Sequence, residues 1–358
     1  MVQALSRPSF EAEWNSLPSV ERISPRRSGH VAFTASPSPE DPVYAFGGYI
    51  EEEPEREGEN FRRKVDNDLW KFCDRSKGWQ KVEQSGDVPG PRLVSAAVAI
   101  KDQAFLFGGW DPQTEGTGGI ILDSVHQLDL NNMKWKKVAE FPDGPTSRHV
   151  AVALPGTNTI LIHNHRCLDH VWLFDTESKK FTKQPTSGDG PGSLGLHVAT
   201  MVDENTMLVF GGAIKDGTMS NKSFLLDTTS WTWTPVQLED QDKCPSPRAG
   251  ACICSYSNDK GVAKCAVLFG GAEATETGLN PRGDVWLMHV GEDGRGVWDL
   301  VIDDTSDETS IIRPPPRNAA TLNQISYNEK SAEFLLTGGW APFRVTRDDV
   351  YVLSLKEK

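Results

Sequence analysis

The chain has 358 residues, and its 37 Lys and Arg set against 50 Asp and Glu give a formal charge of −13. This charge argues against duplex DNA or an anionic membrane surface as a partner of the whole molecule, and no apolar run is long enough to span a membrane. Thirty-two Gly, 23 Pro and 11 Trp indicate many turns and many packed aromatic rings, which favours an all-β protein over a helical one.

A short apolar run that ends in Gly-Gly recurs along the chain and predicts an internal structural repeat. Five copies are complete, with first glycines at Gly47, Gly108, Gly211, Gly270 and Gly338. A degenerate copy, Leu161-Ile162-His163-Asn164, lies between the second and third of these, and aligning it on the others puts His163 in the place of the first glycine. The interval of about 50 residues is typical of solenoids and propellers.

Each repeat predicts four short strands, because runs of four to six apolar residues bounded by turns are typical of β-structure. Strand a follows a Pro/Gly turn, strand b enters Gly-Gly, strand c is the next apolar run, and strand d begins near an aromatic residue. Those aromatic residues are Trp79, Trp135, Phe181, Trp233 and Trp298.

The two ends of the chain complement one another. After Gly338-Gly339 the chain has strand c, at Val350 to Leu353, but no strand d, whereas the segment around Trp14 matches strand d and precedes the first strand a. Pairing these segments would remove two exposed sheet edges. We therefore expect an all-β fold over residues 1–358, a single six-bladed β-propeller of four-stranded antiparallel blades. The blades are expected at about 24–84, 90–140, 145–186, 191–238, 245–303, and 314–355 together with 10–18.

The tandem glycines, the spaced tryptophans and the period resemble kelch repeats over about residues 10–355. The resemblance implies a propeller, and it implies either a protein-interaction platform or, as in a few relatives, an enzyme. Both the glycines and the strand d tryptophans have a structural explanation: the glycines allow a turn with positive φ, and the tryptophans fill the space between blades.

Aromatic and basic residues remain after these structural roles are assigned. Tyr49, Trp110 and Trp340 directly follow Gly-Gly pairs, and His165 is the equivalent in the degenerate copy. Four arginines stand where strand a begins, so the connections from b to c and from d to a would place both groups around one mouth of the channel: Arg27, Arg92, Arg248 and Arg317. Exposed aromatic and Arg side chains are typical of binding hot spots. The alternatives are that the arginines brace neighbouring loops and that the tryptophans pack under their own loops.

Three histidines, His30, His149 and His197, share a position in strand a, three residues after the arginine position with a two-residue gap in the copy of His197. Strand a is the innermost strand, so these side chains are candidates for a channel site that holds Zn or Fe(II). The alternative is that they are wall residues bonded to the backbone. We expect no cofactor.

Two acidic stretches, residues 51–59 and 303–308, fall in loops on the same face. We expect solvated loops there, and the alternative is that they screen the mouth against anions or recruit a basic partner. The six cysteines are too few for a disulfide scaffold, and residues 1–10 lack the apolar core of a secretory signal. We expect a monomer in the cytoplasm, with the nucleus as the alternative location.

We predict that the chain is a non-catalytic scaffold that binds a protein or peptide, such as a carboxylate-bearing one, at one mouth of the channel. A small molecule is an alternative ligand, and no nucleic acid is expected. The alternative function is a metal-dependent lyase or isomerase, or a specifier-like enzyme, with a histidine-lined channel site. The resemblance extends to plant kelch specifier proteins, but their Glu-x-x-x-Asp-x-x-x-His run for Fe(II) is absent, because Asp284 and His289 have the wrong spacing.

Overall fold

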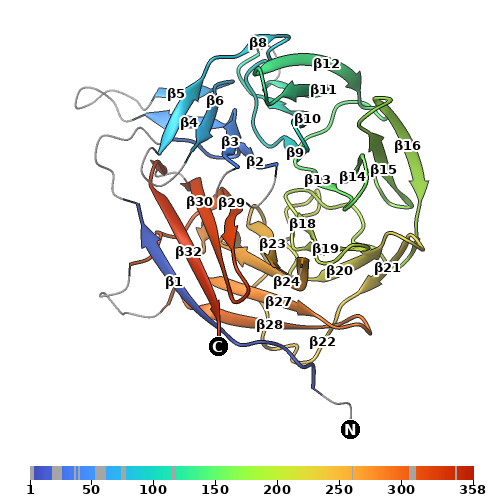
Figure 1. Cartoon of the computed structure of the whole chain (residues 1–358), viewed down its shortest axis with the longest axis vertical. Coiled ribbons are helices and arrows are strands. Elements are labelled where there is room, and N and C mark those ends of the chain that lie inside the picture. The colour runs from blue at the N-terminus through green and yellow to red at the C-terminus, as the bar shows by residue number, and fades with distance from the viewer. Residues whose placement is uncertain are drawn as a thin grey trace.

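The computed structural model describes residues 4–17, 26–35, 38, 41–52, 62–73, 78–114, 118–259, 261–305, 312–342 and 345–358. Within these ranges all regular structure is β-strand, and no helix is present that is long and apolar enough to cross a membrane. Six sheets stand radially around a central axis (Figure 1). The fold is therefore the expected six-bladed β-propeller.

Every blade is a four-stranded antiparallel meander, with strand a innermost and strand d outermost. Blade 1 contains β2 (Val31–Phe33), β3 (Val43–Phe46), β6 (Leu69–Phe72) and β7 (Trp79–Val82). Blade 2 contains β9 (Ala96–Ile100), β10 (Gln103–Asp111), β11 (Ile120–Asp129) and β12 (Lys134–Glu140). Blade 3 contains β13 (Val150–Ala153), β14 (Thr159–His163), β15 (His170–Asp175) and β16 (Lys180–Pro185).

The second half of the ring repeats this arrangement. Blade 4 contains β18 (Val198–Met201), β19 (Thr206–Phe210), β20 (Ser223–Asp227) and β21 (Thr232–Pro235). Blade 5 contains β23 (Cys252–Asn258), β24 (Gly261–Phe269), β27 (Val285–Val290) and β28 (Arg295–Ile302). Blade 6 contains β29 (Asn318–Tyr327), β30 (Ser331–Ala341), β32 (Val350–Glu357) and β1 (Phe10–Ser16).

Short fifth strands cover the outer edges of three blades. Each belongs to the linker from the preceding blade and pairs in parallel with strand d. They are β8 (Ser85–Gly86) on blade 2, β17 (Ser187–Gly188) on blade 4 and β22 (Gln237–Leu238) on blade 5. A covered edge has fewer free backbone groups for unwanted pairing.

The N-terminal strand closes the ring, as the sequence predicts. β1 pairs antiparallel with β32, with Trp14 opposite Leu353. Trp14 is 1% exposed, and its ring meets Phe269 of blade 5 at a centroid distance of 5.3 Å. The closing strand therefore contributes to the hydrophobic core as well as to the sheet.

The strand d aromatic residues pack in the seams between blades, which confirms their predicted role. Trp135 of blade 2 meets Phe46 of blade 1 at 5.2 Å between ring centroids. Trp298 of blade 5 meets Phe210 of blade 4 at 5.0 Å. In blade 4 the partner of Trp233 is His163, at 5.6 Å.

The pairing of strands corrects the alignment of blade 3 by one residue. His163 lies opposite Val150, and Phe46 lies opposite the equivalent Val31. His163 therefore replaces the aromatic residue before Gly-Gly, and Asn164 takes the place of the first glycine. The sequence alone did not fix this register because the copy in blade 3 lacks the Gly-Gly pair that anchors the other five copies.

The Gly-Gly pairs are explained by the next blade. A Cβ atom on Gly338 would lie 2.4 Å from the carbonyl oxygen of Arg27, and one on Gly108 would lie 2.3 Å from that of Thr146. The second glycine also takes a positive φ, and the Gly339 amide donates to the Arg27 carbonyl at 2.9 Å. A side chain here would thus push two blades apart, which explains the repeated requirement for glycine.

Candidate binding face

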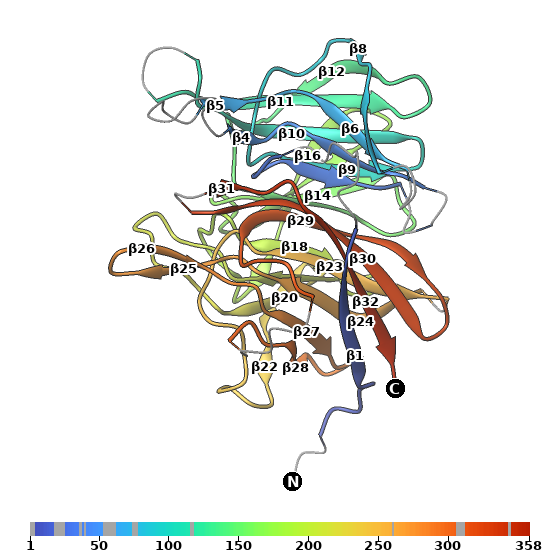
Figure 2. The same cartoon turned by 90° about the vertical axis from the view of Figure 1, so that its left-hand side faces the viewer.

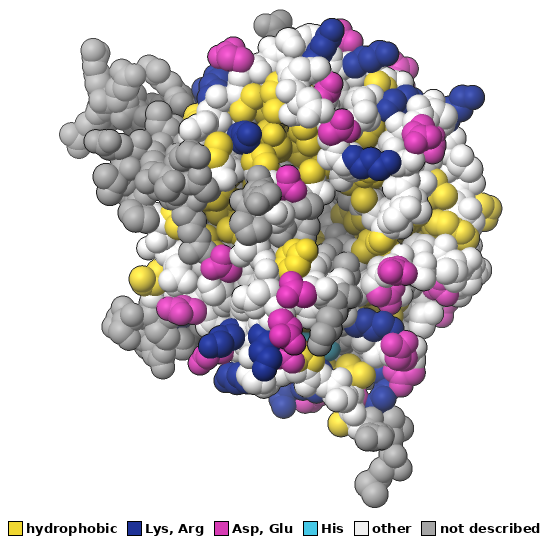
Figure 3. All heavy atoms as spheres, viewed as in Figure 1, with side chains coloured by type: hydrophobic (Ala, Val, Ile, Leu, Met, Phe, Trp, Pro, Cys, Tyr) yellow, Lys and Arg dark blue, Asp and Glu magenta, His cyan; other side chains and the backbone are white. Residues whose placement is uncertain are grey.

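One face of the propeller carries all the connections from strand b to c and from d to a; we call it the loop face. Its b-to-c connections form two-stranded arms in four blades, and these project to the left in Figure 2. The arms are β4 (Tyr49–Glu52) with β5 (Arg62–Val65), the paired ends of β10 and β11, β25 (Ala272–Thr275) with β26 (Gly278–Pro281), and the end of β30 with β31 (Val345–Thr346). The opposite face, viewed in Figure 3, has basic and acidic side chains interspersed around its periphery.

A closed ring of backbone hydrogen bonds surrounds the channel mouth on the loop face. Each blade supplies one residue just before strand a, and its amide donates to the carbonyl oxygen of the equivalent residue in the preceding blade, at 2.7 to 3.0 Å. All six members have a positive φ between 49° and 64°. The members, in chain order, are Gly29, Val94, Arg148, Leu196, Gly250 and Ala319. Because these backbone groups are bonded to one another, a ligand at the mouth would be recognised by side chains.

The four arginines predicted at the mouth are buried, between 0% and 4% exposed. Each guanidinium donates to the carbonyl oxygen of the first glycine of its own blade, as Arg27 does to Gly47 at 2.7 Å and Arg92 to Gly108 at 3.0 Å. Burial lowers the pKa of Arg27 and Arg92 to about 10. These side chains brace the turn that leads from strand b into strand c. Their burial favours the alternative stated from the sequence, that the arginines brace loops, over direct contact with a ligand.

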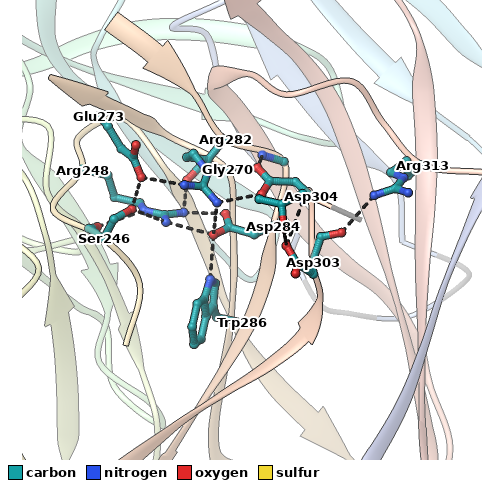
Figure 4. A network of polar contacts seen from close by, with 12 residues as sticks. Ser246, Arg248, Gly270, Glu273, Arg282, Asp284, Trp286, Asp303, Asp304 and Arg313 are labelled. Atoms are coloured by element: carbon teal, nitrogen blue, oxygen red, sulfur yellow. Dashed lines mark hydrogen bonds and ion pairs between the residues drawn. The ribbon is translucent and has the colours of Figure 1, made fainter. Parts of the chain in front are cut away.

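Carboxylates complete two of the braces. Arg248 pairs with Asp284 through two hydrogen bonds of 2.6 and 2.9 Å, and Arg317 pairs with Asp349. In blade 5 the pair extends into a network, in which Arg282 joins Glu273 to Asp304 (Figure 4). The hydrogen bonds that Arg282 donates to the Asp304 carboxylate are the main reason that the pKa of Arg282 is raised.

This network changes the interpretation of the second acidic stretch. Asp304 has a side chain only 8% exposed and is bonded to Arg282 and to the amide of Gly283, so it is a structural residue and not a solvated one. In the first stretch, the carboxylate of Glu51 is buried and accepts a hydrogen bond from Arg63. Residues 53–59 and 306–308 lie outside the described residues.

The predicted aromatic residues are half-buried and belong to the arms. Tyr49 begins β4, Trp110 lies opposite Ile121 in the arm of blade 2, and Trp340 pairs with Thr346. The indole of Trp110 donates to the carbonyl oxygen of Gly118 at 3.3 Å. His165 is exposed in the b-to-c connection of blade 3, one position before the Tyr49 equivalent after the register correction. Their contact with a ligand stays a prediction.

Of the three candidate metal histidines, His30 and His149 are in the lining of the channel cavity and His197 is not, and the three are not brought together. The channel cavity, of about 210 Å³, is lined by strand a of all six blades. The ring of His30 bonds to Thr321 of blade 6 at 3.0 Å, and that of His197 bonds to His163 of blade 3 at 3.0 Å. The ring of His149 packs edge-on against Phe141 between blades 2 and 3. The three imidazoles thus occupy three different seams, and the described residues contain no cluster of three potential metal ligands.

Burial disfavours the protonated form of these imidazole rings. It lowers the pKa of His30 and of His149 to about 3, that of His163 to about 4, and that of His197 well below its usual value. All four are therefore neutral at physiological pH.

Sequence reasoning missed the side chains that the loop face does expose. Seven large apolar residues are exposed along the described part of the chain, and five of them lie in b-to-c or d-to-a connections. The five are Ile120, Ile121, Leu168, Ile214 and Ile312. Arg148, a member of the hydrogen-bonded ring, is the exposed guanidinium beside the channel mouth. The sequence signal was that these apolar residues fall outside the strand pattern, in segments that otherwise read as loops.

Known proteins resemble this chain at the level of both sequence and fold. The family model described as the KLHDC2/KLHL20/DRC7 Kelch-repeats domain matches residues 9–205 and 161–358. Kelch domain-containing protein 2 of Bos taurus is 25% identical over 292 residues, covering 74% of this chain and 67% of that protein. Host cell factor of Drosophila melanogaster is 28% identical over 244 residues, covering 59% of this chain but only 16% of that protein's own length.

Two further likenesses mark the breadth of the architecture. The N-(sulfonatooxy)prop-2-enimidothioate sulfolyase of Thlaspi arvense is 28% identical over 180 residues, which cover 46% of this chain and 50% of that enzyme. The solved structure titled "Structure of YjhT" superposes with a TM-score of 0.64 at 14% identity, covering 95% of this chain and 100% of the other, so it shows the fold alone. With six blades, the Gly-Gly turns and a family match over nearly the whole length, this chain belongs to the kelch-repeat family.

Proposed function

We propose that this chain is a non-catalytic protein-binding module whose loop face contacts the partner. The observation that carries the proposal is the bias of the exposed large apolar side chains toward that face, which holds five of the seven in the described chain. Apolar side chains exposed in excess on one face are typical of interaction surfaces. Propellers of this family commonly serve in protein binding, which supports the same conclusion.

The channel mouth offers an exposed guanidinium to such a partner. Arg148 is exposed, whereas Arg27, Arg92, Arg248 and Arg317 are buried. A carboxylate-bearing partner, as predicted from the sequence, would therefore be recognised through Arg148. The enzymatic alternative gains no comparable support, because its three histidines lie in separate seams.

Site-specific photo-cross-linking tests the face. A benzophenone amino acid placed at Leu168 or Ile121 samples the loop face, and the same group at Tyr327, 41% exposed at the end of β29, samples the opposite face. We expect the first two positions to cross-link a partner protein from cell extract and Tyr327 not to do so. Cross-linking through Tyr327 alone would place the partner on the wrong face and overturn the proposal.

A further inference from the structure

The loop face is uneven around the ring. Blades 5, 6, 1 and 2 carry two-stranded arms, and these four adjacent blades also carry the arginine braces. Blade 3 joins strands b and c through residues 164–169, and blade 4 does so through residues 211–222, a short hairpin in which Ala213 bridges Met219 and the Ile214 amide donates to the Thr218 carbonyl oxygen at 3.0 Å. Thr146 and Leu194 stand at the brace positions of these two blades. The arms of the other four blades thus form a wall that is replaced by a turn at blade 3 and by a short hairpin at blade 4.

A groove lies in this part of the ring, over blade 4. Its volume is about 840 Å³, within the usual range of about 300–1,000 Å³ for ligand sites. The d-to-a connections on both sides of the blade and its b-to-c connection form the walls. Its apolar lining is Leu194, Ile214, Met219, Phe224, Val236 and Leu238. Ile214, at 43% exposure, stands on the rim, and Leu168 of the adjacent blade 3 is 68% exposed.

Polar groups in the groove suit a main chain. The amide side chains of Gln237 and Gln241 are exposed, and the described residues provide no hydrogen-bond partner for either of them. A side-chain amide can both donate to and accept from a peptide unit, which is how an extended segment is held in a groove. The combination of an apolar floor with free amides therefore fits a peptide better than it fits a purely apolar ligand.

The charged residues around the groove indicate whether its occupant is positively or negatively charged. The three connections that form it, residues 186–194, 213–222 and 237–244, contain five carboxylates and three lysines, so their net charge is 3 − 5 = −2. Asp240 pairs with Lys243 and Glu239 with Arg295. Within the described chain the remaining charges, Asp189, Asp216, Asp242, Lys215 and Lys222, make no ion pair and sum to 2 − 3 = −1, and Asp189 and Lys222 line the groove itself. The whole chain, at −13, adds long-range attraction for a cationic partner.

We propose that the groove over blade 4 binds an extended segment of a partner protein that presents apolar side chains beside Lys or Arg. This inference rests on the proposed function and adds a second contact to it, beside the one that Arg148 would make with a carboxylate of the partner. The apolar side chains of the segment would cover Ile214 and Phe224, the glutamines would bond its main chain, and Asp189 would face a basic group.

A selection experiment with purified full-length chain tests the chemistry. A phage-displayed library of random dodecapeptides is panned against the chain, and one enriched peptide is synthesised with a fluorophore for anisotropy titration. We expect enriched sequences to combine apolar with basic residues and to avoid Asp and Glu. The affinity should fall as salt is raised, because exposed charges are screened.

Variants assign the site of that peptide. Ile214→Asp should weaken binding at least about tenfold, a loss of about 1.4 kcal/mol. Asp189→Lys should weaken binding and flatten the salt dependence, whereas Glu329→Lys, at an exposed turn on the opposite face, is the matched charge control. Tyr327→Ala, on the opposite face, is the control and should leave the affinity unchanged, whereas Ile121→Asp, on the arm of blade 2, reports binding elsewhere on the loop face. Each change lies at an exposed residue, so circular dichroism should show an intact fold.

The outcomes separate this inference from the proposed function. Loss of binding in Ile121→Asp but not in Ile214→Asp would retain the loop face and overturn the groove. Loss only in Tyr327→Ala would overturn both. An anionic consensus, a library without enriched peptides, or a wild-type dimer that Ile214→Asp dissociates would each overturn the groove's assignment to a basic partner segment.

Discussion

The amide of Gly29 donates a hydrogen bond of 2.9 Å to the carbonyl oxygen of Ala319, and this contact joins the first blade to the last. It is the bond that closes the six-membered ring at the channel mouth. Near it, the Gly339 amide donates to the carbonyl oxygen of Arg27 across the same seam. The ends of the ring are therefore linked both at the inner strands and, through β1, at the outer edge.

Trp14→Ala should destabilise the whole propeller. The side chain is 1% exposed, and replacing a buried aromatic residue by Ala costs about 3–5 kcal/mol. Urea unfolding followed by tryptophan fluorescence measures the change. Tyr327→Ala, at an exposed side chain, is the control and should cost less than about 0.5 kcal/mol. Equal stability of Trp14→Ala and wild type would contradict a closing role for β1.

Gly338→Ala should destabilise the protein much more than an alanine substitution at a glycine that has no close neighbours. Gly338 has a φ of 62°, and an added Cβ would meet the Arg27 carbonyl oxygen of the next blade. Gly156 has a similar φ of 68° with no atom within 4 Å of the added Cβ, so Gly156→Ala isolates the backbone cost of about 1–2 kcal/mol. Overpacking adds about 1–3 kcal/mol for Gly338→Ala. Equal midpoints of thermal unfolding for Gly338→Ala and Gly156→Ala would contradict this prediction. They would show that the seam between blades 6 and 1 relaxes to accept the added methyl group.

Removing one partner of the Arg248–Asp284 pair should cost about 3–5 kcal/mol, because the side chains are 1% and 3% exposed and a buried charge would be left uncompensated. Arg248→Met combined with Asp284→Asn should recover part of that loss. Arg7→Met, which breaks a pair with Asp299 at 30% and 33% exposure, should cost less than about 1 kcal/mol. Chemical unfolding of the four proteins yields the comparison, and an Arg248→Met loss as small as that of Arg7→Met would exclude a bracing role.

Acid should unfold the protein through its buried histidines. The pKa of His149 is lowered from 6.5 to about 3, mainly by burial, so between these pH values the unfolded chain binds a proton that the folded chain does not. Stability is therefore complete above about pH 6.5 and falls as pH decreases, by about 1.4 kcal/mol per pH unit for each such histidine.

His149→Leu should reduce that slope by about one proton, as measured from the free energy of unfolding between about pH 6 and 4. His165→Leu is the comparison: burial and then the Arg166 guanidinium lower the pKa of this exposed ring less than burial lowers that of His149, so the slope should change less. An unchanged slope in His149→Leu would mean that this imidazole is protonated in the folded protein.

The local pattern of residues was sufficient to predict the fold. Gly47-Gly48 and its repeats mark positions where the neighbouring backbone leaves no room for a side chain. Trp14 marks a strand that precedes the first blade in sequence and pairs with the last one. Both signals are local in sequence, and their spacing fixes the number of blades. This is why the count, the closure and the place of the strand d aromatic residues could be predicted.

The candidate site needed the tertiary structure. From sequence, Arg27 and Arg248 look like surface residues, but the turn of their own blade supplies carbonyl oxygens that draw the guanidinium groups into the interior. The histidine register was correct, yet its side chains point into separate seams, because each ring reaches toward the preceding blade or the linker before its own strand a.

The hydrogen-bonded ring has no sequence signature at all. Val94 and Arg148 occupy positive φ although neither is glycine, since each gains one amide bond and one carbonyl bond from neighbouring blades. Sequence alone determined the period, the strands and the closing segment of this protein, because these follow from local patterns. Contacts between blades determine which polar side chains are bonded inside the fold and which apolar ones reach the surface. Only the assembled ring therefore decided these features.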